Sequence, residues 1–255
     1  MSEDEISYFH QAIMVLQNGL DGFQKIVSVR NLFYTLLPTP NRNMHTSDPY
    51  KVNLLNGTLH IMQDGDKWML KFLPHSKSDY LVNTIPVRYD ETGLERNEEF
   101  LAMVDRILSK DPEKVDKICL LQEMYGACVA PIFPHLFMLH GPGGSGKTSL
   151  MIPAMRLVDP SNYSSVEPHE FKGFNLEEMA GRLVNFVTDI DVLEPISDAN
   201  IKKIEDRVPI RIARKFKTAA LGVLPAIHIF AGNDIPATYE KGSGAHKRRC
   251  LFLLS

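Results

Sequence analysis

Apolar residues follow two different periodicities in the first part of the chain. In residues 5–37 they recur at helical spacing and the run ends before Pro38, which predicts one or more helices. In residues 52–90 short apolar runs are separated by Asn-Gly and Asp-Gly pairs, which favour tight turns between antiparallel strands. The pattern therefore predicts a small α+β unit at the start of the chain.

Helical spacing returns at Asn97 and continues to about residue 130, with a second helix start at Asp111-Pro112. Strand-like runs then alternate with polar or helical segments, which is typical of a three-layer α/β domain. These runs cover residues 136–140, 183–188, 208–213, 226–231 and 250–254. We expect three regions: an N-terminal α+β region at 1–96, a helical, collar-like lead-in at 97–132, and the α/β domain at 133–255.

Composition and charge exclude several classes of protein. No apolar run reaches the length of a membrane span, and the first residues do not resemble a signal peptide. The three cysteines stand in apolar contexts and suit reduced thiols in a cytoplasm. The net charge of −3 gives no global indication of a nucleic-acid partner. Any contact with nucleic acid must therefore come from a local basic segment.

The segment LFMLHGPGGSGKTSL has the order strand, glycine-rich turn, helix, and fits the pattern G-x-x-x-x-G-K-[ST]. Its backbone N–H groups and the helix N-terminus would face phosphate oxygens. Lys147 would reach the β- and γ-phosphates and the Thr148 hydroxyl would bind Mg²⁺. A turn with a solvated lysine is the alternative, but the flanking strand and helix favour an NTP site. The residues expected to hold the nucleotide are Gly141, Pro142, Gly143, Gly144, Ser145, Gly146, Lys147, Thr148 and Ser149.

Carboxylates for the metal and the attacking water follow a second apolar strand, in RLVNFVTDIDVLE. Asp189 and Asp191 project to the same side of an extended chain. With Thr148 they are the expected metal ligands, and one of them would polarise water. The alternative is that both acids cap the helix that follows.

Two further polar groups could face a γ-phosphate. Asn233 ends the buried run AIHIFAGNDIP, where its amide could hold the attacking water; Asn-Asp-x-Pro is equally good turn chemistry. Arg248 and Arg249 precede the last apolar run. An arginine so placed could reach the nucleotide of a neighbouring subunit, or it could be a surface cation.

The segment RVPIRIARKFKTAA carries a cluster of cations around a β-type alternation, with Phe216 among them. Arg214, Lys215 and Lys217 are the candidate contacts for a nucleic-acid backbone, with a base stacked on the aromatic ring. A solvated edge strand protected by its charges is the ordinary alternative.

In this order and spacing, the segments resemble the superfamily-three helicases of the poxvirus and phage-plasmid primase-helicase type, over nearly everything from residue 50 to the end. LLQEMYGACVAPIFPHLFMLHGPGGSGKTSL is similar to the helical lead-in and Walker A of that family, and FNLEEMAGRLVNFVTDID to its Walker B region. IKKIEDRVPIRIARKFK resembles the basic B′ segment, FAGNDIP the Walker C asparagine, and GAHKRR the arginine that follows. NLLNGTLHI and FLPHSKSDYLVNTIPVRYD are similar to the region ahead of the helicase.

The resemblance implies a modified AAA+ fold, that is, a P-loop NTPase, and an ATP- and Mg²⁺-dependent DNA helicase or translocase. Its context would be phage, viral or plasmid DNA replication in the cytoplasm of a host cell. Asn233 would sense the γ-phosphate and Arg249 would be a finger acting in trans. Lys215 and Lys217 would contact single-stranded or forked DNA in the channel of a homo-hexameric ring. The implied catalytic set is Lys147, Asp189, Asp191, Asn233 and Arg249.

The sequence departs from the family in two respects. Relatives often carry glutamate in Walker B, so which aspartate binds the metal stays open. Residues 1–50 are too short for a primase module, so we expect either a separate primase or loader as a partner or a longer natural protein. Two other classes share the phosphate cradle: a regulatory or assembly ATPase that does not unwind DNA, and a nucleotide or metabolite kinase. A kinase would need an arginine-rich lid, and residues 157–233 contain no such insertion.

Overall fold

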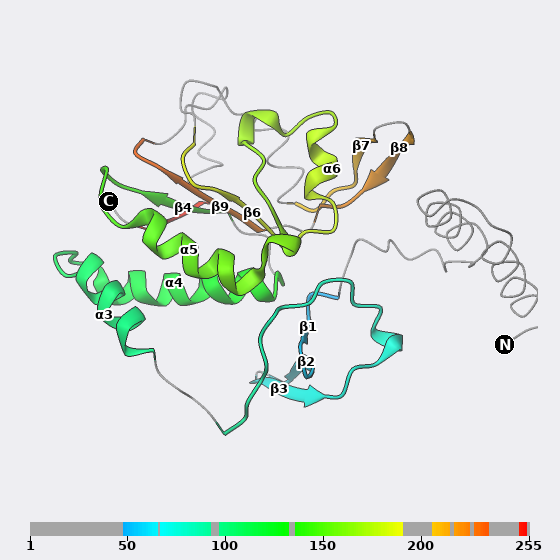
Figure 1. The fold of residues 1–255 in the computed structure, drawn as a ribbon, viewed down its shortest axis with the longest axis horizontal. Coiled ribbons are helices and arrows are strands. Elements are labelled where there is room, and N and C mark those ends of the chain that lie inside the picture. The colour runs from blue at the N-terminus through cyan, green and yellow to red at the C-terminus, as the bar shows by residue number, and fades with distance from the viewer. Residues whose placement is uncertain are drawn as a thin grey trace, which may run out of the picture. The chain divides into compact units, whose positions relative to one another are not determined.

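The computed structural model describes residues 48–65, 67–92, 97–132, 136–190, 206–214, 217–224, 227–234 and 250–253 (Figure 1). All of them belong to one compact unit formed by residues 44–255. The helices predicted for residues 5–37 lie outside the described ranges. None of the helices within those ranges combines the length and the apolar character that a bilayer span requires.

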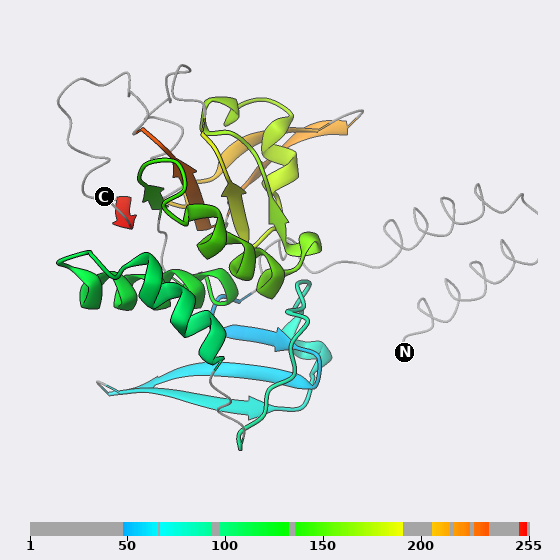
Figure 2. The same cartoon turned by 60° about the vertical axis from the view of Figure 1, so that its left-hand side comes forward.

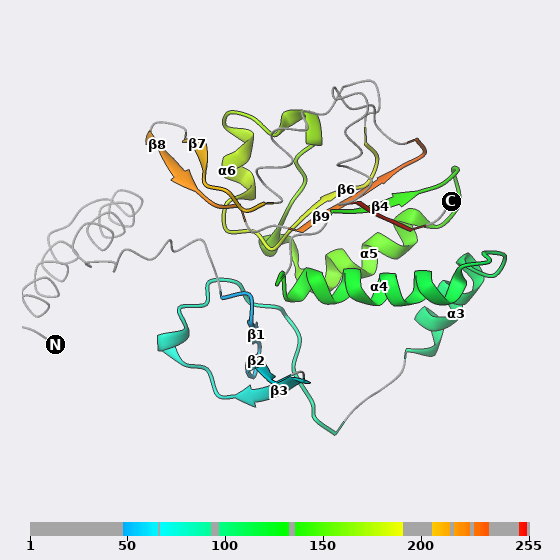
Figure 3. The same cartoon turned by 180° about the vertical axis from the view of Figure 1, so that it is seen from behind.

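A five-stranded parallel sheet forms the centre of the unit, in the order β10-β4-β9-β6-β5 (Figure 3). Its central strands are buried along almost their whole length, which explains their uninterrupted apolar sequence. Its strands are β4 (Leu136–His140), β5 (Tyr163–Ser164), β6 (Val184–Val187), β9 (Ile227–Gly232) and β10 (Cys250–Leu253). Four of these strands confirm predicted runs; β5 was missed because two residues carry no periodicity.

Helices cover both faces of the parallel sheet, so the predicted mixed α/β architecture is confirmed. On one face lie α4 (Lys114–Val129) and α5 (Lys147–Val158), whose apolar side chains join those of β4 and β9 in one buried cluster. On the other face lie the short helix α6 (Asn175–Met179), η3 (Pro168–Glu170) and β7 (Ile210–Arg214). Both faces of the sheet are therefore removed from water.

The helical lead-in contains α3 (Glu98–Ile107) before α4. Its predicted start is confirmed, because the Asn97 side chain accepts a hydrogen bond from Phe100 N at 3.0 Å. The second helix begins at Lys114, two residues later than a cap at Asp111 and a first helical residue at Pro112 predict. The Asp111 carboxylate instead accepts hydrogen bonds from Glu113 N at 2.9 Å and Lys117 Nζ at 2.6 Å, which places it before the helix.

The predicted hairpins form a three-stranded antiparallel sheet, β1 (Lys51–Leu54), β2 (Gly57–Asp64) and β3 (Lys67–Leu73), followed by η1 (Lys77–Asp79). The first turn lies one residue earlier than the Asn-Gly pair predicts, since Leu54 pairs with Gly57 and leaves Leu55 and Asn56 as the loop. A Cβ on Gly57 would come within 2.5 Å of the Phe72 ring. Glycine is therefore needed at position 57 because β3 lies so close, and not because of the turn.

The small sheet is fixed to the parallel sheet by apolar packing and by a pair of asparagines. Figure 2 shows α4 between the two sheets, and Val52, Leu54 and Ile85 belong to the same buried cluster as that helix. Asn83 Nδ2 donates to Asn162 Oδ1 at 3.0 Å, and Asn162 Nδ2 donates to the backbone at two points. Because Asn162 is buried, this network holds the segment after β3 against η2 (Pro160–Asn162).

The basic segment is a two-stranded hairpin of β7 and β8 (Lys217–Gly222). The alternation at 208–213 correctly predicted the first strand, whereas the second was not predicted. Arg214 pairs with Lys217 at the end of the ladder. Lys215 and Phe216, which connect them, lie outside the described residues. Arg214 and Lys217 are therefore placed at the tip of an antiparallel hairpin, whereas Arg211 lies further along β7.

Candidate functional site

The carboxyl ends of three neighbouring strands bring the predicted site residues to one edge of the sheet. β4, β9 and β6 are adjacent and parallel, so the chain leaves all three at the same edge. There the loop 141–146 follows β4, Asn233 follows β9, and Asp189 comes shortly after β6. Two backbone hydrogen bonds continue the ladder past the strands: Gly141 N to Gly232 O (3.4 Å) and Ile190 N to Ala231 O (2.9 Å).

The ammonium group of Lys147 is surrounded by neutral oxygen atoms. It donates to the carbonyl oxygens of Gly141 at 2.7 Å and Pro142 at 3.0 Å, and lies 3.5 Å from Ser145 Oγ. It also donates to Asn233 Oδ1 at 2.9 Å, across 86 residues of sequence. No carboxylate of the described residues forms an ion pair with it. The Lys147 ammonium therefore lies at the mouth of the loop, beside the end of β9.

The glycines of the loop serve two different purposes. Gly146 precedes α5 with φ +95°, and a Cβ there would lie 2.7 Å from Ile107 Cδ1, so both the backbone and the packing require glycine. Gly143 and Gly144 have open space where a Cβ would stand. No side chain caps the N-terminus of α5. The loop thus offers uncapped N–H groups beside open space, which is the geometry that an anion needs.

A nucleotide phosphate with Mg²⁺ fits the residues at this edge. Thr148, at the start of α5, and Asp189 are both exposed, whereas Asp191 lies outside the described residues. Among the described side chains no three His, Cys, Asp or Glu gather into a metal-binding group. Mg²⁺ is usually held by one or two carboxylates together with the phosphates of its substrate. One hydroxyl and one or two aspartates therefore match Mg²⁺ better than they match a cation whose ligands all come from the protein.

The remaining predicted residues are placed only in part. Arg248 and Arg249 lie outside the described ranges, but Cys250, which follows them, is the first residue of β10 and pairs with Leu136. Leu136 is the first residue of β4, and the loop follows the last, His140. β10 therefore enters the sheet at the edge opposite the loop.

Two buried contacts of the α/β domain were not predicted from sequence. Ile107, at the end of α3, packs on Gly146, and a helical apolar residue gives no signal for such a contact. His228 is the second residue of β9, at the end of the strand away from the loop, where burial lowers its pKa to about 4 and keeps it neutral. Its ring lies 5.2 Å from the Phe171 ring, centroid to centroid. It is a core residue of the sheet and not a ligand of the loop.

We expect Gly146→Ala to impair both stability and nucleotide binding. A non-glycine residue at positive φ costs about 1–2 kcal/mol, which corresponds to a fall of about 2–8 °C in Tm for a chain of this size. The new methyl group would also displace Ile107 and shift the start of α5. Gly143→Ala is the matched control, because its Cβ meets nothing within 4 Å. Thermal melts of both variants check this; equal Tm values would contradict the strained conformation.

Comparison with known proteins gives a family match and partial structural likenesses. The model of a family of unknown function (DUF5906) matches residues 139–249. No curated protein matches the chain. An apo structure of the NrS-1 C-terminal region, A form, has 10% identity and a TM-score of 0.46, covering 80% of this chain and 57% of that chain. A second apo structure of that region has 11% identity and a TM-score of 0.44, covering 84% and 62%.

A JCV helicase bound to a small acetamide compound has 18% identity and a TM-score of 0.38, covering 65% of this chain and 47% of that one. The chain thus spans less than two thirds of the length of the solved structures that it resembles. We draw no function from these partial likenesses.

Proposed function

We propose that the chain is a P-loop NTPase of the modified AAA+ type that couples ATP hydrolysis to movement on DNA, as a helicase or translocase. The observation that carries the proposal is the contact between Lys147 and Asn233 at 2.9 Å. It joins the cation of a glycine-rich loop to an amide at the end of the neighbouring strand. An anion bound in the loop would therefore meet both groups at once, the cation as its counter-charge and the amide as a hydrogen-bond donor.

The residues of the site divide the chemistry among them. The N–H groups of residues 143–149 and the Lys147 ammonium would bind and orient the phosphates of ATP. Mg²⁺, held by Thr148 and an aspartate, would supply neutralisation of phosphate charge. The other aspartate would accept a proton from the attacking water, and the Asn233 amide would orient that water.

We expect Asp189→Asn and Asp191→Asn both to depress ATP hydrolysis, with only one of them sparing nucleotide binding. The variant that spares binding has lost the group that polarises water, whereas the other has lost a metal ligand. Initial hydrolysis rates and titration with a fluorescent ATP analogue measure the two effects separately. Asp116→Asn, in the exposed part of α4, is the control. If both variants behave like the control, the carboxylates come from elsewhere in the chain.

We propose that the β7–β8 hairpin contacts the DNA backbone through Arg214, Lys215 and Lys217. Replacing both lysines with alanine should weaken binding of single-stranded DNA and lower its salt dependence by about one unit of slope per lost phosphate contact. Basal ATP hydrolysis should persist, since neither lysine is among the groups proposed to bind or hydrolyse the nucleotide. DNA affinity measured at several salt concentrations checks this, with Lys110→Ala as the control. An unchanged slope of DNA affinity against salt concentration would favour the alternative, in which the hairpin is a solvated edge that does not contact DNA.

The test of the function as a whole is ATP hydrolysis measured with and without single-stranded DNA, together with the mass of the oligomer. A motor of this class hydrolyses ATP faster on DNA and forms a ring, which we propose to be a homo-hexamer. DNA-independent hydrolysis without strand separation would favour the regulatory or assembly ATPase. Phosphate transfer to a small acceptor in place of water would favour the kinase. A separate primase or loader remains part of the proposal as a partner.

A further inference from the structure

A cavity of about 140 Å³ lies where the small antiparallel sheet meets the parallel sheet. Residues that precede β4 and β6, among them Pro131 and Leu183, line it together with β1. It therefore opens at the edge opposite the loop 141–146. Val52, Ile85 and Val129 give it apolar walls, whereas its charged lining residues are Asp48, Lys51, Arg182 and Arg207.

Arg207 is an unusual residue in three respects. Its backbone has φ +52°, a left-handed conformation that side chains other than glycine seldom adopt outside functional sites. Its guanidinium is half-buried, and burial lowers its pKa. It donates to the carbonyl oxygens of Pro131 at 2.5 Å and Ile132 at 3.3 Å, but to no carboxylate of the described residues. A half-buried guanidinium whose described partners are two carbonyl oxygens is favourably placed for an anion.

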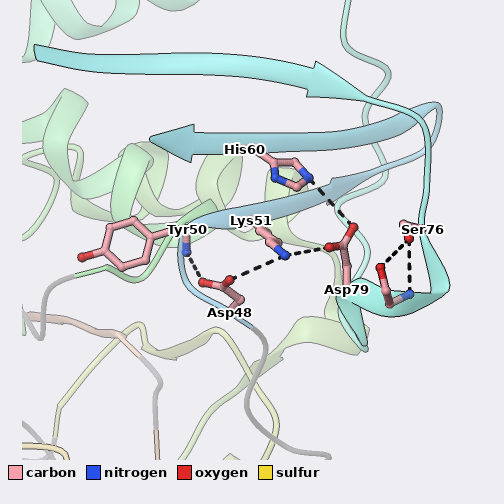
Figure 4. Close-up of polar contacts among 7 residues, drawn as sticks. Asp48, Tyr50, Lys51, His60, Ser76 and Asp79 are labelled. Atoms are coloured by element: carbon pink, nitrogen blue, oxygen red, sulfur yellow. Dashed lines mark hydrogen bonds and ion pairs between the residues drawn. The ribbon is translucent and has the colours of Figure 1, made fainter. Parts of the chain in front are cut away.

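The other charges of the cavity leave an excess of positive charge. Lys51 is paired with Asp79 at 2.6 Å and lies 3.9 Å from Asp48, as Figure 4 shows. Lys51 is thus shared between two carboxylates, and these three groups together with Arg182 and Arg207 carry a net charge of +1. Arg182 donates to Ser161 O and has no carboxylate partner within the described ranges. Two arginines therefore line the cavity without a carboxylate partner in the part of the chain that the structure describes.

Two exposed aromatic rings lie close to this cavity, although neither of them lines it. Tyr50 lies between two lining residues, and Figure 4 shows it on the opposite side of the strand from the Lys51 side chain. Its ring is nearly parallel to that of Trp68, with an interplanar angle of 8° and centroids 6.1 Å apart. Tyr50 is 40% exposed and Trp68 is 51% exposed. Tyr50 also interacts electrostatically with Arg207.

We infer that this cavity and the Tyr50–Trp68 pair form a second contact site for single-stranded nucleic acid. Arg182 and Arg207 would bind a phosphate group, and the exposed rings would stack on bases, which are accessible only when unpaired. The inference rests on the proposed function for its choice of DNA as the strand. β7 begins three residues after Arg207, so the chain leads directly from the cavity into the basic hairpin. One strand could thus be held at both places.

Trp68 provides a direct measurement, because it is the only tryptophan in the sequence. Titration of the full chain with oligothymidylate should quench its fluorescence in a saturable, salt-sensitive manner. Tyr50→Ala and Arg182→Gln should each weaken this binding by about tenfold, whereas Met69→Ala should leave it unchanged. Met69 is the matched control, since it is exposed on the same strand as Trp68, β3, but on the other face of the sheet. Thermal melts identify any variant that has merely lost stability.

Arg207→Lys keeps the charge but not the fork of N–H groups that reaches the Pro131 and Ile132 carbonyls. It should weaken oligothymidylate binding less than Arg207→Gln does. The comparison separates the effect of the positive charge from the effect of the hydrogen bonds to the two carbonyl oxygens. Absence of quenching by oligothymidylate would overturn the inference. So would equal competition by inorganic phosphate or thymidine monophosphate, which would indicate a small-molecule phosphate site. A fluorescence change that follows protein concentration without DNA would overturn it in favour of a protein interface.

The failure of this inference and the failure of the proposed function give different results. Lys147→Ala should leave the Trp68 quenching intact while hydrolysis is lost, because the loop and the cavity are at opposite edges of the sheet. DNA-stimulated hydrolysis without Trp68 quenching would refute only the second contact site. Quenching in a chain that never hydrolyses ATP would refute only the motor.

Discussion

Replacement of Lys147 by alanine is expected to lower ATP hydrolysis by about 10²–10³-fold and to weaken nucleotide binding. The ammonium contacts the loop at Gly141 and Pro142 and the end of β9 at Asn233, all within 3.0 Å. Its loss removes the cation that faces the phosphates and leaves the Asn233 amide without the group that orients it. Hydrolysis rates and titration with a fluorescent ATP analogue measure both effects.

Lys172→Ala is the control for this variant, because Lys172 is exposed in a loop and forms no ion pair among the described residues. Its hydrolysis should equal that of the unmodified chain. Hydrolysis at the unmodified rate in Lys147→Ala itself would show that the loop does not hold the nucleotide. The function would then have to be sought at another site.

A mixture of two inactive variants is expected to recover activity if the site is shared between subunits. Arg249→Ala should bind ATP yet turn it over about 10³–10⁵-fold more slowly, as when an arginine finger is lost. Cys250, the residue after Arg249, enters the sheet at the edge opposite the loop. This favours contact of Arg249 with the nucleotide of a neighbouring subunit over contact with the nucleotide of its own subunit. Lys147→Ala has the complementary defect. Mixed oligomers would therefore contain some interfaces that pair a sound loop with a sound arginine.

Three observations decide the outcome of that experiment. Arg248→Ala, run in parallel, shows which of the adjacent arginines faces the nucleotide. Native mass measurement must show that mixed oligomers form. If they form and stay inactive, or if activity per subunit does not change when the unmodified protein is diluted, the shared site is refuted. The kinase alternative, which needs no partner subunit, would then gain support.

The sequence predicted the elements that carry strong periodicity and missed those that depend on distant contacts. Buried strands such as β4 and β9 are continuous apolar runs bounded by turn residues, so they can be found without structure. β5 and α6 are too short for a pattern. The first hairpin loop was placed one residue too late because Gly57 looks like a turn glycine, whereas the space in front of Phe72 decides its position.

The candidate site was predicted to a similar extent. Local chemistry identifies the loop and the polar residues after strands, because a glycine-rich turn and an acid at a strand end are visible in a few residues. The contact of Lys147 with Asn233 depends on strand order, which no short segment encodes. The packing of Ile107 on Gly146 and the left-handed backbone of Arg207 are equally invisible, since each follows from tertiary contacts. The roles of all the predicted site residues stay predictions, and Asp191, Lys215 and Arg249 also lie outside the described residues.

The position of β9 in the sheet has a consequence for how the protein is made. β9 lies between β4 and β6, although both are synthesised before it. A nascent chain that has not yet reached residue 227 would therefore hold two apolar strands whose facing edges lack their common neighbour. Such unpaired edges are prone to association with other chains. The glycine loop would emerge from the ribosome well before its asparagine, so the site can be completed only late, when the middle of the sheet closes.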